Sequence, residues 1–382
     1  MRLFFLTFFA VYGSVHAYAF LRTRSAFGFG PGIGIPLALF MLAMTMAPFL
    51  IRVLEQREYE TTARMLSYIA YLWMAVLFLY LCSSLVMDGA NLVLRGAAWA
   101  SGRNASSFVI PARPSFLAAA AVSLVICVYG YFSALDIRTE RMVIETAKLP
   151  AGTDRFKIVQ ISDVHLGLIV RCDRLARIME IVKAEKPDLF VSTGDLVDAQ
   201  INHMTGLAEL LQQVRAPHGN YAITGNHEYY AGLSQALDFT RSAGFKLLRG
   251  EAVAGGIINI AGVNDPTGLQ LKTDREVPEA EMLSRLPRNK FTLLLKHRPA
   301  IDGKAAMLFD LQLSGHTHKG QIFPFTYLAK MAYPLNAGAF ELPQGGFLRV
   351  SRGTGTWGPP VRFLSPPEVT VIELVRKTGE SK

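Results

Sequence analysis

Five short polar segments in the second half of the chain carry residue types that bind metal ions. They hold five of the eight histidines in the 382-residue sequence, and none of them contains a cysteine. Carboxylate, amide and imidazole donors without a thiolate suit Mn, Fe, Zn or Mg. In chain order the segments are Asp163-Val164-His165, Gly194-Asp195, Gly225-Asn226-His227-Glu228, His297 and Gly315-His316-Thr317-His318.

The spacing within two of these segments favours a shared ion. Residues two apart on extended backbone point the same way, so Asp163 with His165, and His316 with His318, can each face one ion. Two ions about 3.5–4 Å apart can clamp the attacking and leaving oxygens of an in-line displacement at phosphorus. Each segment alone is typical of a surface turn, a cap or a buried histidine. The ordered set of five predicts a binuclear metal site.

The polar segments follow short apolar runs that predict strands, and helical stretches alternate with these runs. Continuous apolar strands alternating with helices indicate sheets covered on both faces. Ligand sites in such folds gather beyond the carboxyl ends of strands, so the five segments are expected to converge. The charged stretch 265–290 is expected to be a surface excursion. The predicted strands are 156–161, 188–192, 221–224, 257–263, 291–295, 311–313, 347–351 and 369–375, and the helices are 171–185 and 207–214.

With this ordered signature, the sequence resembles the calcineurin-like metallophosphoesterase superfamily from about Arg155 to Val375. The resemblance implies an α/β domain of four layers, in which two mixed β-sheets pack face to face with helices outside. It also implies two divalent or mixed-valence ions, among Mn, Fe, Mg and Zn, and a phosphate-ester or pyrophosphate substrate. Glu228 stands where many members of the superfamily have Asp.

Carried over by position, the resemblance implies a role for each residue of the signature. One metal would be bound by Asp163, His165 and His318, and the second by Asn226, His297 and His316. The carboxylate of Asp195 would bridge the two, and a metal-bridging hydroxide would attack phosphorus. His227, next to the ligand Asn226, would protonate the leaving oxygen or stabilise the transition state. Asn226 and His227 are therefore the catalytic candidates.

The first 135 residues have a different composition from the rest. The whole chain is 51% hydrophobic and 18% charged, against about 25% charged in soluble domains. Residues 1–135 contain nine Arg, no Lys and four acidic residues. Neither half has a dense basic run, so nucleic-acid binding is not expected. The composition predicts a membrane region before a soluble domain.

Uncharged stretches in this region predict about four transmembrane helices, at 3–21, 35–51, 66–87 and 115–135. A glycine-rich loop at 28–34 is expected between the first helix and the second. The alternatives are a cleaved signal peptide for the first stretch, which ends in Ala17-Tyr18-Ala19, and buried helices of a soluble protein. No span contains an ionisable Asp, Glu, Lys or Arg, which favours an anchor over a transporter. The region is followed by an expected linker at 136–154, the domain at 155–377 and a tail at 378–382.

The membrane region suggests where the domain works. With the N-terminus inside, seven basic residues near the spans face the cytoplasm and five face the opposite side, which favours a cytoplasmic catalytic domain. The segments 351–356, 359–362 and 367–368 resemble the end of a membrane-attached bacterial branch. That branch includes phosphodiesterases and hydrolases of a nucleotide-linked lipid precursor. Together with the predicted spans, this resemblance favours a multi-pass protein of the bacterial inner membrane. The anchor favours a lipid-linked substrate, and a nucleotide-linked substrate is the other expectation. The alternative for these C-terminal segments is a plain Gly/Pro-rich loop before the last strand. The alternative for the function of the protein is a non-catalytic membrane sensor or scaffold. The sequence does not predict an oligomeric state.

Overall fold

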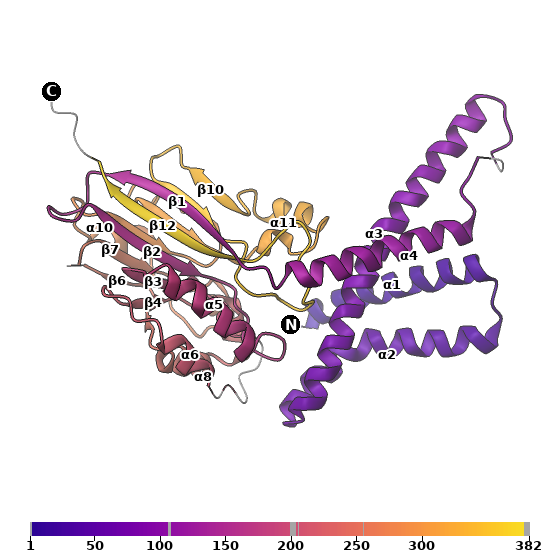
Figure 1. Cartoon of the computed structure of the whole chain (residues 1–382), viewed down its shortest axis with the longest axis horizontal. Coiled ribbons are helices and arrows are strands. Elements are labelled where there is room, and N and C mark those ends of the chain that lie inside the picture. Colours follow the sequence, from indigo (N-terminus) through magenta and orange to yellow (C-terminus); the bar gives the residue numbers. More distant parts are fainter. Residues whose placement is uncertain (1, 106–107, 199–203, 205, 255, 378–382) are drawn as a thin grey trace. The chain divides into compact units, whose positions relative to one another are not determined.

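The computed structural model describes residues 2–105, 108–198, 204, 206–254 and 256–377 (Figure 1). The chain divides into two compact units. We call residues 1–132 with 358–363 the helical unit, and residues 133–357 with 364–382 the sheet unit. The first boundary of the helical unit falls after Phe132, and a short C-terminal segment is grouped with the helices.

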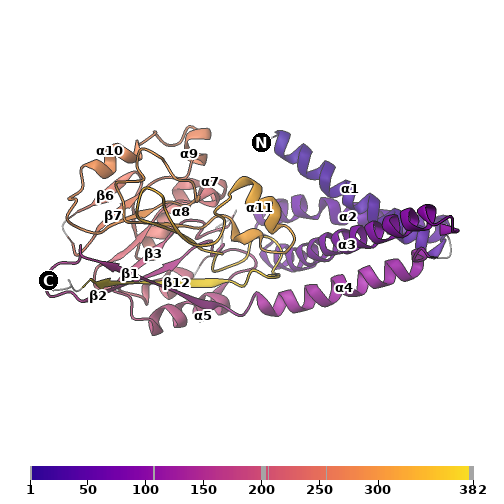
Figure 2. The same cartoon turned by 90° about the horizontal axis from the view of Figure 1, so that it is seen from above.

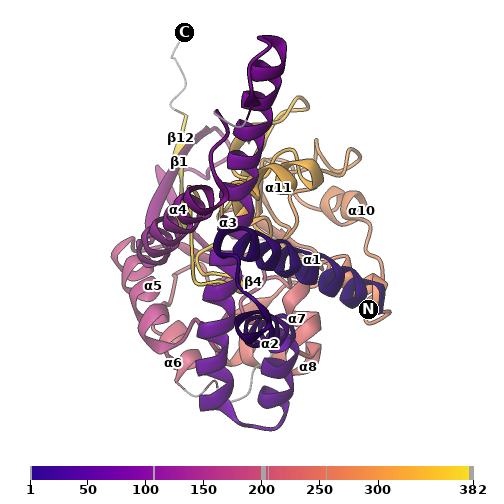
Figure 3. The same cartoon turned by 90° about the vertical axis from the view of Figure 1, so that its right-hand side faces the viewer.

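Among its described residues, the helical unit contains the α-helices α1 (Arg2–Phe27), α2 (Pro31–Gln56), α3 (Glu60–Ala100) and α4 (Ala112–Ser133) (Figure 3). Among the described residues, α2, α3 and α4 are long and apolar enough to cross a membrane. The stretch 3–21 lies within α1, and its spanning a membrane stays a prediction. The 41 residues of α3 extend about 60 Å, twice the hydrocarbon thickness of a bilayer.

Two details of the helical unit differ from the sequence expectation. The glycine-rich loop expected at 28–34 is shorter, because α2 already begins at Pro31, a residue well suited to the first turn of a helix. An ion pair also lies inside the helices: Arg22 contacts Asp88 at 2.8 Å, and Tyr18 donates to the same carboxylate at 2.8 Å. Arg22 and Asp88 each follow the last residue of a predicted uncharged stretch, and the helices continue past both.

The C-terminal segment 358–363 belongs to the helical unit because it packs on α4. The backbone N–H of Arg362 donates to the carbonyl of Gly130 at 2.8 Å. A Cβ at Gly130 would lie 2.6 Å from the side chain of Val361, so the close approach requires glycine. The rings of Tyr129 and Phe363 meet edge to face at 6.1 Å. This segment is thus held by the end of the last helix.

The sheet unit is built on two six-stranded sheets. The first has the order β1-β12-β2-β3-β4-β5, and the second β10-β11-β9-β8-β7-β6. Both are mixed, because β12 runs antiparallel to β2, β10 to β11 and β6 to β7, whereas the other neighbours are parallel. The strands are β1 (Arg138–Thr146), β2 (Arg155–Ile161), β3 (Leu189–Ser192), β4 (Asn220–Ala222), β5 (Lys246–Leu247), β6 (Glu251–Val253), β7 (Asn259–Gly262), β8 (Thr292–Leu295), β9 (Leu311–Ser314), β10 (Gly338–Glu341), β11 (Phe347–Val350) and β12 (Glu368–Arg376).

Alternating side chains of these strands form the layers. In β2, Ile158 packs between the two sheets, whereas Val159 faces the helices. The helices α5 (Cys172–Ala184), α6 (Leu207–Gln212) and α8 (Leu233–Ser242) supply the apolar layer against the first sheet (Figures 1 and 2). In α5 the buried residues Leu175, Ile178, Met179 and Val182 follow helical spacing. The helix α10 (Glu279–Ser284) packs on the other side, against the second sheet. The predicted four-layer fold is confirmed.

The stretch 136–154, expected to be a linker, contains strand β1. This strand pairs in parallel with β12, from Arg138 opposite Glu368 to Thr146 opposite Arg376. Its side chains are mostly exposed or half-buried, and only Ile144 is buried. An edge strand is held by backbone hydrogen bonds on one side and needs no continuous apolar run. Because β1 contains several charged residues and no continuous apolar run, its hydrophobic pattern does not predict a strand.

Candidate metal centre

All five polar segments lie just beyond strand ends at one edge of the two sheets. β2 leads to Asp163 and His165, and β3 leads to Asp195. The short helix α7 (Asn226–Ala231) follows β4, so Asn226 is its first residue. His297 follows β8, and His316 and His318 follow β9, where His318 opens the 3-10 turn η2 (His318–Gly320). The ends of parallel strands therefore bring the segments together, as the sequence predicted.

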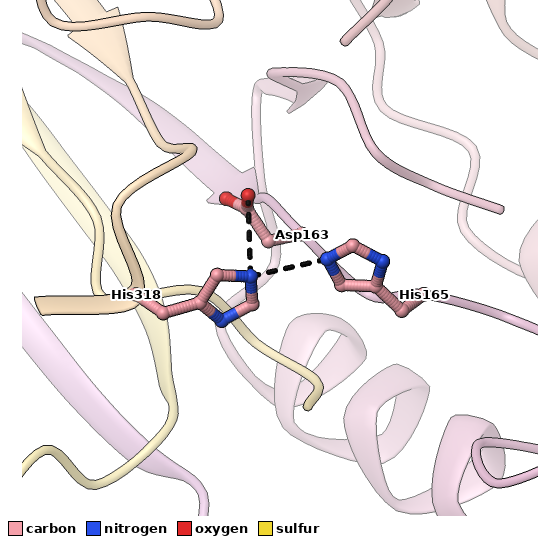
Figure 4. A group of neighbouring side chains, drawn as sticks. All are labelled: Asp163, His165 and His318. Carbon is pink, nitrogen blue, oxygen red and sulfur yellow. Dashed lines mark hydrogen bonds and ion pairs between the residues drawn. The ribbon is translucent and has the colours of Figure 1, made fainter. Parts of the chain in front are cut away.

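A first cluster consists of Asp163, His165 and His318 (Figure 4). The Nε2 atoms of the two histidines lie 3.1 Å apart, and Nε2 of His318 lies 3.6 Å from Oδ1 of Asp163. All three side chains are buried. Two imidazole nitrogens and a carboxylate oxygen that converge in this way form one face of a metal site.

A second cluster consists of Asp195, His297 and His316. Oδ2 of Asp195 lies 3.2 Å from Nε2 of His297, and that nitrogen lies 3.2 Å from Nδ1 of His316. Nδ1 of His297 lies 2.8 Å from the carbonyl of Thr193, a contact that leaves Nε2 directed at the cluster. Oδ2 of Asp195 also lies 3.9 Å from Nε2 of His165 in the first cluster. Asp195 is therefore the carboxylate common to both.

The residues present fit two divalent ions. Oδ1 of Asn226 is buried and has no hydrogen-bond partner among the described residues. A buried, unpaired amide oxygen is costly unless another group satisfies it. In each cluster two histidine nitrogens converge at hydrogen-bond distance, so both can coordinate the same cation. The donors are all nitrogen or oxygen, as Mn, Fe, Zn and Mg accept.

The backbone at the site adopts conformations that ordinary residues avoid. Asp163, His165, Asp195, His316 and His318 all have positive φ, between 48° and 72°. Left-handed backbone at a non-glycine residue costs free energy and is retained where the surrounding structure enforces it, often at functional sites. Here the tight left-handed turns point successive donors at the same small volume.

Gly225 lies against the common carboxylate, and a side chain there would disturb it. A Cβ at this position would lie 2.2 Å from Oδ1 of Asp195. We expect Gly225→Ala to lower the free energy of unfolding by about 1–3 kcal/mol, the usual cost of an extra atom in a filled site, and to reduce bound metal per chain. Metal analysis and thermal unfolding measure both effects.

Gly303→Ala is the matched control for this change, because a Cβ there would meet nothing within 4 Å. Full metal content and unchanged stability in Gly225→Ala would show that the carboxylate can move away without loss.

Glu228 fixes the loop that carries Asp195, a role that the sequence reading missed. Its carboxylate accepts from the backbone N–H groups of Gly225 at 2.7 Å, Asp195 at 3.0 Å, Leu196 at 2.8 Å and Val197 at 3.3 Å. Burial raises the pKa of Glu228, and the neighbouring negative charge of Asp195 raises it further. The residue joins the α7 turn to the loop after β3. A glutamate three residues after a helix N-cap is the usual signal for such a contact.

Replacing this carboxylate with an amide places an N–H donor against N–H groups. We expect Glu228→Gln to lower the free energy of unfolding by about 2 kcal/mol, because buried donors lose their acceptor. Chemical denaturation measures the change. Glu209→Gln on the exposed face of α6 is the control and should be neutral. Equal stability of the two variants would contradict the bracing role.

His227 lies beside both clusters and next to the ligand candidate Asn226. Its backbone N–H donates to Oδ1 of Asp195 at 2.8 Å, and its Nδ1 lies 3.0 Å from Oδ1 of Asp198. Burial lowers the pKa of His227, but Asp195 and Asp198 outweigh this effect and raise it to about 9. Asp198 therefore lies against this imidazole, on the side of Nδ1.

Asp265 lies after β7 in the stretch expected to be a surface excursion, but it is buried and forms an ion pair with the half-buried Arg298 after β8. Arg298 donates to both carboxylate oxygens of Asp265, at 2.7 and 2.9 Å, and to Thr267 at 3.0 Å. Burial raises the pKa of Asp265, but Arg298, His297 and Thr267 together lower it below its ordinary value. Arg298 therefore has a structural partner next to His297, and Lys296 is paired with Glu279. The stretch has no strand among its described residues, as expected.

Comparison with known proteins agrees with this geometry. The model of the calcineurin-like phosphoesterase family matches residues 156–320. A metallophosphoesterase of Aquifex aeolicus is 42% identical over 258 residues, which cover 67% of this chain and 98% of that protein. A metallophosphoesterase of Bacillus subtilis is 36% identical, covering 64% of this chain and 89% of that protein.

A relative from Bos taurus, a transmembrane protein with metallophosphoesterase domain, is 30% identical over 328 residues, which cover 81% of this chain and 73% of that protein. This similarity extends beyond the residues of the sheet unit into the helical unit. The clusters of His and Asp are those typical of a binuclear site. The chain thus belongs to the calcineurin-like metallophosphoesterases, hydrolases that cleave phosphoester bonds.

Proposed function

We propose that this protein is a membrane-anchored, two-metal hydrolase of phosphodiester or pyrophosphate bonds. The observation that carries the proposal is the position of Asp195 between two converging clusters. In this assignment Asp163, His165 and His318 hold one ion, and Asn226, His297 and His316 hold the second. Asp195 contributes a carboxylate to both.

The metal ions and the surrounding side chains have separate roles in this proposal. Two bound ions would supply Lewis acidity at the phosphoryl oxygens and lower the pKa of a bound water. The chain itself fixes the donors: Thr193 orients His297, and Glu228 holds the loop of Asp195. His227 is placed to give a proton to the leaving oxygen, with Asp198 orienting its ring. General-acid help of this kind is usual for imidazole.

A lipid-linked or nucleotide-linked substrate suits an enzyme with this architecture. In the described part of the chain, three helices long and apolar enough to cross a membrane precede the sheet unit. Relatives carry the description transmembrane protein. An anchor restricts the metal centre to the neighbourhood of the bilayer, where lipid phosphodiesters and pyrophosphates occur. The non-catalytic sensor is disfavoured because all seven ligand positions are filled.

The test uses the full chain in detergent, loaded with manganese. We expect hydrolysis of bis-p-nitrophenyl phosphate, and faster hydrolysis of a nucleotide-linked lipid pyrophosphate than of a generic phospholipid. A fully metallated protein that leaves diester, monoester and lipid pyrophosphate panels intact would contradict the proposal.

The cytoplasmic location of the sheet unit belongs to the same proposal, as does residence in the bacterial inner membrane. The seven-to-five distribution of basic residues supports it. A reporter fused after Lys382 that is active only inside the cell should signal, and one active only outside should be silent. The reverse result would place the metal centre outside and exclude a cytosolic nucleotide substrate.

A further inference from the structure

An exposed apolar surface surrounds the helix α11 (Thr326–Ala332) in the sheet unit. None of the seven residues of this helix is buried. Tyr327 is 62% exposed, Leu328 55% and Met331 81%. Trp357 and Leu364, which are distant in sequence, are also more than half exposed. We call these five side chains the α11 surface.

Hydrogen bonds hold the parts of the α11 surface together. The side chain of Gln321, just before α11, accepts from the backbone N–H of Trp357 and donates to its carbonyl, both at 2.9 Å. The ammonium of Lys319 donates to the carbonyl of Leu364 at 3.3 Å. Trp357 and Leu364 are therefore both fixed to the segment that leads into α11.

Trp357 of the α11 surface and Tyr333, the residue after α11, both adjoin the metal centre. The ring of Trp357 lies 6.0 Å from that of His227. The ring of Tyr333, which follows α11 directly, lies 5.2 Å from that of His316. Whatever covers this surface is therefore next to the reacting groups.

The charge around α11 indicates the kind of partner. Residues 311–340 include Lys319 and Lys330 and no Asp or Glu, and Lys330 is exposed. Aromatic and aliphatic side chains combined with lysines and no acids are typical of segments that lie in the interface of an anionic bilayer. Trp357 and Leu364 also flank segment 358–363, which packs on α4, one of the apolar helices.

We propose that the α11 surface binds the interface of an anionic lipid bilayer, with Leu328 and Met331 inserted among the acyl chains. The inference rests on the proposed membrane anchoring and not on any particular substrate. It gives the metal centre a lipid-facing border, so that a phosphoester at the bilayer surface reaches the metals without leaving the lipid. The other possible occupant, a second copy of the chain, is an outcome of the test.

The test measures lipid contact in the full chain. Met331→Cys carries an environment-sensitive fluorophore, in a background with Cys82, Cys127 and Cys172 replaced by serine, and the protein is placed in nanodiscs of phosphatidylglycerol and phosphatidylcholine. Brominated acyl chains should quench it by about twofold, as expected for a side chain inserted below the headgroups. Ala184→Cys, exposed at the end of α5, is the control and should stay unquenched.

Two further measurements complete the test. Leu328→Cys should behave as Met331→Cys does, and Lys330→Gln should weaken quenching when phosphatidylglycerol is present. Equal, weak quenching at 331, 328 and 184 would overturn the proposal. Energy transfer between labelled copies, without quenching by lipid, would assign the surface to a dimer and would also overturn it. Because no activity is measured, these results are independent of whether the enzyme cleaves the proposed substrates.

Discussion

Asp195→Asn should lower kcat/KM for bis-p-nitrophenyl phosphate by on the order of a thousandfold, because it removes the one carboxylate positioned to serve both ions. Oδ2 of Asp195 lies 3.2 Å from His297 and 3.9 Å from His165, so both clusters depend on it. The substitution preserves shape and leaves an amide with half the acceptor capacity and no charge. Bound metal should fall below two ions per chain, as measured by elemental analysis.

Asp238→Asn is the matched control for this change. Asp238 is an exposed carboxylate on α8 that pairs only with Arg241, at 2.9 Å, among the described residues. It should keep full activity and metal content. An Asp195→Asn variant with two tightly bound ions and near-normal turnover would show that the bridging assignment is wrong.

His227→Gln should slow hydrolysis by about 10²–10⁴-fold, the range expected when a general acid is lost. The loss should be largest for an alkyl or nucleoside diester and smallest for a p-nitrophenyl ester, because p-nitrophenolate leaves without a proton. Metal content should stay at two ions, since His227 is not among the assigned ligands. Steady-state rates on the two ester classes, with metal analysis, check this.

His218→Gln is the control, because His218 is exposed and its ring packs on Phe156, away from the metal centre. Asp198→Asn should reproduce a weaker form of the His227 defect with the same dependence on leaving group. An equal loss for both ester classes would indicate that His227 acts as a ligand or as a structural residue instead of a proton donor.

Much of the fold followed from hydrophobic pattern. The run 156–161 corresponds to β2, and the helix predicted at 171–185 corresponds to α5. These elements are buried on both faces or on one clear stripe, so tertiary packing and local pattern agree. Strand β1 was missed because an edge strand is stabilised by its backbone, and β5, with two residues, is too short for any pattern.

The seven ligand candidates could be read from the sequence because each follows a strand end. The residues that support them could not. Asp198, Glu228 and Asp265 reach the site through turns whose geometry depends on contacts between distant segments, such as Glu228 with Leu196 at 2.8 Å. In the sequence, an Asp or Glu that accepts hydrogen bonds from buried backbone N–H groups cannot be distinguished from one on the solvated surface. Only the folded backbone distinguishes the two.

The chain passes between the helical unit and the sheet unit three times, after Phe132, Trp357 and Phe363. Only four residues separate the end of α4 from β1, a reach of about 14 Å at most. With the proposed membrane anchor and lipid-linked substrate, so short a connection means that enzyme and substrate meet by lateral diffusion in two dimensions. Its turnover should then follow the mole fraction of substrate in the bilayer, and diluting the substrate with inert lipid should slow it even when the amount of substrate per volume is constant.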